Sequence, residues 1–226
     1  MPARARVSAR AIGGIEVTAT AKTELGKIIF LNGVSSAGKT TLAKALQQKL
    51  DEPYYWLSED VFRATTPAKY DEDDGEREWA WIDSIFAMYH VAKMFSGMGM
   101  CAIVDTVMDD EIWEKKAVEA LHDSPALFVR VTCPPEELQR REKERGNREI
   151  GLAIDQLSQL HPLDNACDIA VDTHANTTEE CADRIIALLD DADNFRAFKA
   201  LWERRCDGAG KQAKEICEKG AMNERR

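Results

Sequence analysis

Five apolar segments of strand length recur along the 226-residue chain, and the stretches between them have helical periodicity. The segments span residues 27–32, 54–57, 101–104, 126–132 and 168–171. Strands that alternate with helices form βαβ units, in which parallel strands make the sheet and helices cover its faces. The first and third segments are apolar at nearly every position, as in strands buried on both faces. The sequence therefore predicts an α/β fold with a mostly parallel five-stranded sheet and helices on both faces, in three layers.

The alternation of strands and helices occupies the middle of the chain. Residues 1–25 contain Arg4, Arg6 and Arg10 and no apolar block, which predicts a flexible leader. Residues 26–190 form the predicted domain, and residues 191–226 a C-terminal helical or disordered appendage. Thr177 and Glu180 are spaced as a capping box, so the last helix of the domain should begin there.

Composition excludes several classes of protein. Forty acidic residues against 30 basic ones give a net charge of -10. This charge disfavours a long nucleic acid as the partner, because its phosphates are also negative. No segment has the roughly 20 consecutive apolar residues of a membrane-spanning helix, so we expect no membrane span. The six cysteines lack CxxC spacing and are expected to be reduced. These features predict a cytoplasmic protein, with an organelle transit peptide at the arginine-rich start as the alternative.

A glycine-rich loop follows the first apolar segment. Residues 33–40 read GVSSAGKT and match the phosphate-binding pattern GxxxxGK[ST], with a strand before it and a helical stretch after it. The backbone N–H groups of such a loop face an anion at a helix N-terminus, Lys39 reaches the β and γ phosphates, and Thr40 offers a hydroxyl to Mg²⁺. We predict a site for ATP and Mg²⁺. Its expected nucleotide-binding residues are Gly33, Val34, Ser35, Ser36, Ala37, Gly38, Lys39, Thr40 and Thr41.

A second metal ligand is expected at the end of a neighbouring strand. Asp105 follows the apolar segment 101–104, at the edge of the sheet where α/β proteins bind ligands. We interpret Asp105 as the acid that holds Mg²⁺ together with Thr40. The alternative is that Asp105 caps the next helix, a role that we assign instead to Asp109 and Asp110.

A candidate base comes just after the second strand segment. Asp60 should project at the same edge of the sheet and face the γ-phosphate, where its carboxylate can accept the proton of an acceptor hydroxyl. Glu59 is the neighbouring acid that could be mistaken for it. The alternative for Asp60 is an N-cap of a helix over residues 61–64.

Four arginines lie between residues 140 and 148, in a helical stretch that begins after Pro134 and Pro135 and ends at Gly146. Guanidinium groups on such a segment stabilise the charge of a transferring phosphoryl group. We predict catalytic roles for Arg141, Arg145 and Arg148 and a surface position for Arg140. The alternative is a solvated helix face on which Glu142 and Glu144 pair with the arginines.

Together these residues resemble the chloramphenicol phosphotransferase family over residues 27–190. The resemblance rests on the loop at 32–40, Asp60, Asp105, the stretch 141–151, Gln156, His161 and the run 168–173. It implies a P-loop kinase fold in which ATP phosphorylates a primary hydroxyl of an antibiotic, with Asp60 as the base and with Lys39, Thr40 and Arg148 at the nucleotide.

The expected partner is a small molecule with a hydroxyl acceptor. Residues 64–96, which should shape the acceptor pocket, match the family only loosely and combine an acidic loop at 71–78 with an aromatic helix. Such a loop is typical of a solvated connection, and such aromatic residues of a core. The function expected is an ATP- and Mg²⁺-dependent O-phosphotransferase. The alternatives are a nucleotide-dependent switch or toxin-like P-loop protein, and a nucleoside kinase.

Overall fold

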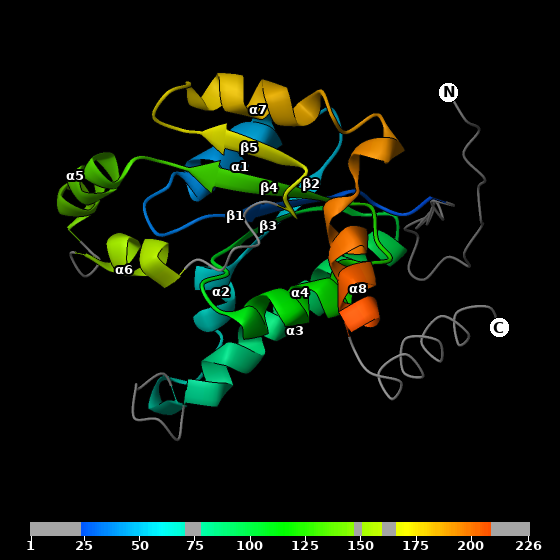
Figure 1. The fold of residues 1–226 in the computed structure, drawn as a ribbon, viewed down its shortest axis with the longest axis horizontal. Helices are drawn as coiled ribbons and strands as arrows, with labels where there is room; N and C mark the ends of the chain where they lie inside the picture. Colours follow the sequence, from blue (N-terminus) through cyan, green and yellow to red (C-terminus); the bar gives the residue numbers. More distant parts are fainter. Residues whose placement is uncertain (1–23, 71–77, 147–150, 160–165, 209–226) are drawn as a thin grey trace, which may run out of the picture.

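The chain forms a five-stranded parallel sheet between two layers of helices (Figure 1). The computed structural model describes residues 24–70, 78–146, 151–159 and 166–208. The strands are β1 (Ile28–Asn32), β2 (Tyr54–Ser58), β3 (Cys101–Thr106), β4 (Ala126–Thr132) and β5 (Ile169–Asp172). The helices are α1 (Lys39–Lys49), α2 (Glu59–Arg63), α3 (Glu78–Gly97), α4 (Glu111–Leu121), α5 (Pro135–Arg145), α6 (Leu152–Gln159), α7 (Thr178–Ile186) and α8 (Ala197–Gly208), with 3-10 turns η1 (Ala68–Tyr70) and η3 (Ala192–Asn194).

The sheet has the strand order β2-β3-β1-β4-β5, and each neighbouring pair is parallel. All five predicted segments are strands, with ends within two residues of those expected. Parallel pairing brings the carboxyl ends of the strands to one edge, where Asn32 is paired with Thr106 and Ser58 with Asp105. This edge carries the candidate site.

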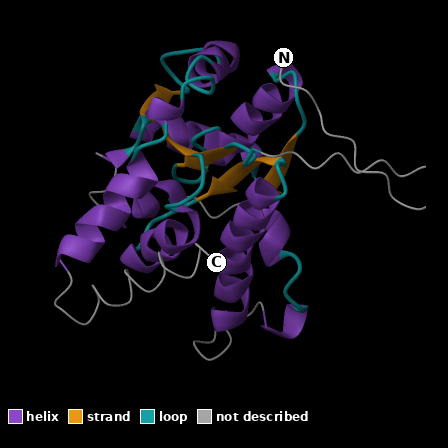
Figure 2. Ribbon diagram, turned by 90° about the vertical axis from the view of Figure 1, so that its right-hand side faces the viewer, coloured by secondary structure: helices purple, strands orange, loops and turns teal. Residues whose placement is uncertain are grey.

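The alternation of side chains along β1 divides the core into two parts. Ile29 and Leu31 pack in one cluster with residues of α1 and α7, and Ile28 and Phe30 pack in the other with residues of α3, α4 and α8. The four side chains are fully buried. Figure 2 shows the strands between these two sets of helices. Because successive side chains of a strand point to opposite faces, an unbroken apolar segment supplies both cores.

The helix α8 lies within the expected C-terminal appendage, and it packs against the core. Ala197, Phe198 and Leu201 are each at most 3% exposed, and the Phe198 ring lies 5.1 Å from that of Phe30. Asp168 accepts hydrogen bonds from the backbone N–H groups of Arg196 and Ala197 and so fixes the start of the helix. A short stripe of apolar residues at helical spacing is enough to pack a helix against the core when the sheet presents aromatic side chains on that face.

The boundaries expected at residues 25 and 190 stay predictions, and the expected leader lies almost wholly outside the described residues. The capping box is confirmed: the Thr177 side chain accepts from the Glu180 N–H at 3.2 Å, and the Glu180 carboxylate accepts from the Thr177 N–H at 2.8 Å.

The cysteines follow the expectation in part. Cys101, Cys133, Cys167 and Cys181 are not in disulfide bonds, whereas Cys206 is disulfide-bonded, contrary to the expectation of reduced thiols. Spacing along the chain does not show which sulfur atoms a fold brings together. Over the described ranges, no helix combines the length and the apolar character needed to cross a bilayer.

Candidate active site at the carboxyl edge of the sheet

The glycine-rich loop turns sharply between β1 and α1. Ser36 has a φ of 61° and Gly38 a φ of 96°, both in the left-handed region that only glycine adopts readily. A Cβ on Gly33 would lie 2.4 Å from the carbonyl oxygen of Val131, so the close approach of β4 also demands glycine. The local backbone therefore explains the glycine at position 38, and the neighbouring strand β4 explains the glycine at position 33.

Two hydroxyl groups of this loop are buried without a partner. Ser35 and Ser36 are 5% and 8% exposed, and within the described part of the chain their Oγ atoms make no hydrogen bond. Buried polar groups normally have a hydrogen-bond partner. Two buried hydroxyl groups without a partner at a helix N-terminus therefore favour a bound anion as that partner. Lys39 is also buried, and its Nζ donates to the carbonyl oxygens of Gly33 at 2.7 Å and Val34 at 3.1 Å.

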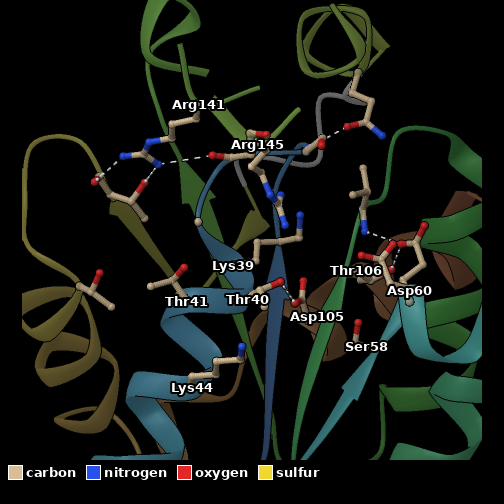
Figure 3. Close-up of a pocket in the computed structure, with 18 of the residues that line it drawn as sticks. Lys39, Thr40, Thr41, Lys44, Ser58, Asp60, Asp105, Thr106, Arg141 and Arg145 are labelled. Carbon is tan, nitrogen blue, oxygen red and sulfur yellow. Dashed lines mark hydrogen bonds between the residues drawn. The ribbon is translucent and has the colours of Figure 1, made fainter. Parts of the chain in front are cut away.

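Thr40 and Asp105 lie side by side although they come from different elements. Thr40 Oγ1 donates to Asp105 Oδ2 at 2.8 Å (Figure 3). Asp105 is the fifth residue of β3 and is 5% exposed. The following helix α4 is capped by Asp110, whose carboxylate accepts from the Ile112 N–H at 2.8 Å, so Asp105 is not a helix cap. A hydroxyl and a carboxylate oxygen in contact form a donor set that suits Mg²⁺.

These groups line one pocket of about 600 Å³. Ten residues predicted for the site lie in its wall: Ser35, Ser36, Gly38, Lys39, Thr40, Thr41, Asp60, Asp105, Arg141 and Arg145. Gly33, Val34 and Ala37 belong to the loop but do not line the pocket, and Arg148 lies outside the described residues. The wall also contains Lys44, Ser58, Glu59, Thr106, Val107, Glu144, Gln156, Thr173 and Thr178.

The adjacent acids Glu59 and Asp60 have different surroundings. Asp60 is exposed in the first turn of α2, whose N-cap is Ser58, so Asp60 is not the cap. Glu59 accepts from Thr106 Oγ1 at 3.0 Å and from the Val107 N–H at 2.9 Å. Burial raises the pKa of Glu59, and these two hydrogen bonds oppose the shift. Glu59 thus ties α2 to the end of β3, a contact that its place after a strand did not reveal.

Arg141 is held by the protein itself. Its guanidinium donates to Glu137 at 2.8 Å and to Thr173 Oγ1 and the Thr173 carbonyl oxygen, each at 3.0 Å. Thr173 Oγ1 in turn donates to the Ala37 carbonyl oxygen at 2.7 Å. Arg141 therefore fastens α5 to the loop after β5 and to the phosphate loop.

Arg145 is available to a ligand. Within the described ranges it makes no hydrogen bond or ion pair, and its side chain points toward Lys39 (Figure 3). Arg140 lies on the surface as expected and pairs with Glu137 and Glu144. Hydrogen bonds from Arg140 and Arg141 hold the pKa of Glu137 down to about 2.

The alternative of a solvated helix face with Glu142 on it is wrong for this residue. Glu142 is fully buried and accepts from the N–H groups of Gly151 at 3.0 Å and Ala153 at 2.7 Å. The Glu142 carboxylate therefore acts as the acceptor for backbone N–H groups at the start of α6. The alternation of charges along α5 did not indicate this role.

The aromatic helix α3 belongs to the core, as the expectation favoured. Met88 and Tyr89 are fully buried, and Trp81 and Phe86 pack against the same cluster. The acidic residues at 71–77 and His161 lie outside the described residues.

Comparison with known proteins identifies the family. The family model of chloramphenicol phosphotransferase-like proteins matches residues 26–190. The chain belongs to the chloramphenicol phosphotransferase-like family. A curated relative from Mycobacterium tuberculosis, named "Putative O-phosphotransferase Rv2636", is 31% identical over 180 residues, which cover 70% of this chain and 79% of the relative.

Solved structures confirm the P-loop kinase fold. The M. tuberculosis APS kinase CysC in complex with AMPPNP and APS superposes with a TM-score of 0.59 at 20% identity, over 74% of this chain and 99% of the kinase. Shikimate kinase from Acinetobacter baumannii in complex with shikimate gives 0.57 at 19% identity, over 74% and 94%. The family member described here is thus a small-molecule kinase, and a non-catalytic switch is no longer a competing hypothesis.

Proposed function

We propose that this kinase transfers the γ-phosphoryl group of ATP, with Mg²⁺, to a hydroxyl of a small molecule. The observation that carries the proposal is that Lys39, Arg145, Ser35 and Ser36 line one pocket, with the two serine hydroxyls unpaired and the Thr40–Asp105 contact beside them. Two cations and two unpaired hydroxyl groups at a helix N-terminus suit a polyphosphate.

Thr40 and Asp105 would hold the magnesium ion. Their contacting oxygens are of the ligand type that Mg²⁺ prefers, and among the described residues no cluster of three His, Cys, Asp or Glu side chains offers a different metal site. A magnesium ion supplies neutralisation of charge on the phosphate oxygens during phosphoryl transfer.

Lys39 and Arg145 would stabilise the charge of the transferring group. Lys39 is pre-positioned by the loop carbonyls of Gly33 and Val34. Fixed cations aimed at developing charge lower a barrier without reorganisation during the reaction. Arg141, which was expected to act in the same way, also lines the pocket and donates to Thr173, whose hydroxyl donates to the phosphate loop.

Asp60 would be the base that accepts the proton of the acceptor hydroxyl. Both acids line the pocket, but Asp60 is exposed, whereas Glu59 is half-buried and its Oε2 already accepts from two donors. A base must reach the proton that it removes, and the exposed carboxylate meets this requirement better.

The acceptor would be a hydroxylated antibiotic such as chloramphenicol, or a related metabolite. Its support is the description of the matching family and the O-phosphotransferase name of the curated relative. The described wall of the pocket is almost entirely polar, with Val107 as its one aliphatic side chain beyond threonine. Such a wall also suits sugars, nucleosides and hydroxylated acids such as the shikimate bound by the structurally similar shikimate kinase.

The decisive experiment measures ATP consumption against a panel of acceptors. The panel contains chloramphenicol, aminoglycosides, peptide antibiotics, nucleosides, sugars, shikimate and adenylyl sulfate, each with Mg²⁺ and with the product checked by mass spectrometry. A phosphorylated chloramphenicol would establish the antibiotic acceptor, and turnover of another member with chloramphenicol inert would reject it. A purified, folded enzyme that binds no ATP would reject the proposed function altogether.

A further inference from the structure

Gln156 on α6 connects three parts of the active site. Its Oε1 accepts from the Ser35 N–H of the phosphate loop at 2.7 Å, and its side chain opposes the rise that burial causes in the pKa of the Asp109 carboxyl group. Ser35 belongs to the phosphate loop, and its Oγ is one of the two unpaired hydroxyl oxygens there. Asp109 lies in the segment between β3 and α4. One half-buried amide therefore bridges α6, the phosphate loop and the segment after β3.

The segment that receives Gln156 is firmly held. The Val107 N–H donates to Glu59 at 2.9 Å, and the Met108 N–H donates to Asn32 Oδ1 at 2.8 Å. The Trp113 side chain of α4 likewise lowers the pKa of the Asp109 carboxyl group, against the effect of burial. Residues 107–109 are thus fixed to α2, β1 and α4, and Gln156 attaches α6 to a rigid support.

The other end of α6 is attached to the helix that carries Arg145. Buried Glu142 of α5 accepts from the N–H groups of Gly151 and Ala153, at the start of α6. Arg145 lies three residues beyond Glu142 in the same helix. The helix α6 is therefore a strut, with Glu142 joining it to α5 and Gln156 joining it to the phosphate loop.

We propose that Gln156 is a positioning residue that holds Arg145 over the γ-phosphoryl group, an inference that rests on the proposed function. A long arginine side chain with no partner in the described structure is placed only by the helix that carries it. That helix reaches the phosphate loop through α6 and Gln156, and through Arg141 on its other side. Without the amide bridge, α5 would keep its fold but lose one of its two attachments.

The test compares the binding of ADP and AMPPNP, both with Mg²⁺, by isothermal titration calorimetry. Arg145→Ala should weaken AMPPNP by about tenfold and leave ADP within about twofold, because a charge-assisted hydrogen bond to the γ-phosphate is lost. Gln156→Ala should give the same selective loss. The double variant should be no weaker than Arg145→Ala alone, because both changes remove one interaction. Gln159→Ala, an exposed glutamine of the same helix, is the matched control.

Exchanging the side chains of Gln156 and Asp109 distinguishes a positioning role from a general loss of structure. Gln156→Glu sets two carboxylates against each other and should weaken AMPPNP, whereas Gln156→Glu combined with Asp109→Asn keeps one amide, one carboxylate and the same net charge. The combination should bring AMPPNP affinity back to within about threefold of the wild type.

Three results would overturn the inference: an unchanged AMPPNP affinity in Gln156→Ala, equal losses for ADP and AMPPNP, or losses that multiply in the double variant with Arg145→Ala. These results leave the proposed function standing, because wild-type binding of ATP and turnover of an acceptor test that function separately. A wild-type protein that binds neither nucleotide would reject both.

Discussion

Thr40 and Asp105 are 65 residues apart in the sequence, yet the Thr40 hydroxyl donates to the Asp105 carboxylate at 2.8 Å. We expect Asp105→Asn to raise the magnesium concentration needed for half-maximal rate, because an amide oxygen is a weaker ligand for Mg²⁺ than a carboxylate. The measurement is a magnesium titration of turnover at fixed ATP. Asp51→Asn, an exposed acid after α1, should behave as the wild type. An unchanged magnesium requirement would remove Asp105 from the metal site.

Asp60 should give a different phenotype. Asp60→Asn keeps the size of the side chain but cannot take the acceptor's proton, so we expect kcat to fall by about 10²-fold or more with ATP affinity nearly unchanged. Steady-state kinetics and ATP titration separate the two quantities. If Asp60→Asn shifts the magnesium requirement instead, the roles of the two acids are reversed. Glu59→Gln is the companion variant, and a larger loss of turnover there at equal stability would move the base to Glu59.

Lys39→Ala should abolish most activity without unfolding the protein. Removing a cation that stabilises the transferring phosphoryl group should lower turnover by about 10² to 10⁴-fold. Thermal unfolding should be little changed, since Lys39 Nζ contacts loop carbonyls rather than the core. Lys115→Ala, on the exposed side of α4, is the control. Near-wild-type turnover of Lys39→Ala would show that the glycine-rich loop is not the catalytic phosphate site.

Arg141→Ala and Arg145→Ala should differ in stability. Arg141 joins α5 to Thr173 and to the phosphate loop, so its removal should lower the free energy of unfolding by about 1–3 kcal/mol through unpaired buried partners. Arg145→Ala should leave the free energy of unfolding within about 0.5 kcal/mol, because its side chain is exposed. Chemical denaturation measures both. Equal stabilities would contradict the fastening role of Arg141.

Phe198→Ala tests whether α8 is part of the core. Phe198 is 2% exposed and its ring lies 5.1 Å from that of Phe30 and 5.4 Å from that of Phe128. Its truncation should lower the free energy of unfolding by about 3–5 kcal/mol, the usual cost of removing a buried aromatic side chain. The neighbouring Lys199→Ala is exposed and should change it by less than about 0.5 kcal/mol. A small effect of Phe198→Ala would return α8 to the status of an appendage.

Local patterns in the sequence predicted the strands, the phosphate loop and the capping box of α7. Each depends on residues close together in the chain: an apolar run, the glycines around Lys39, or the spacing of Thr177 and Glu180. The edge of the sheet to which Asp60 and Asp105 belong followed as well, because parallel strands bring their carboxyl ends together. These features depend on residues that are close together in the chain, so the sequence alone was enough to predict them.

Only the tertiary structure assigned different surroundings to residues of the same type. Glu142 and Glu144 lie two residues apart, yet one is buried against the start of α6 and the other pairs with Arg140 at the surface. Arg141 and Arg145 lie one turn apart on the same face of α5, and only Arg141 hydrogen-bonds Thr173, which comes from a distant segment of the chain. The sequence determined which chemical groups are available along α5 and the phosphate loop, and the packing of α5, α6 and α8 decided which of them are open to the pocket and which are held by other parts of the protein.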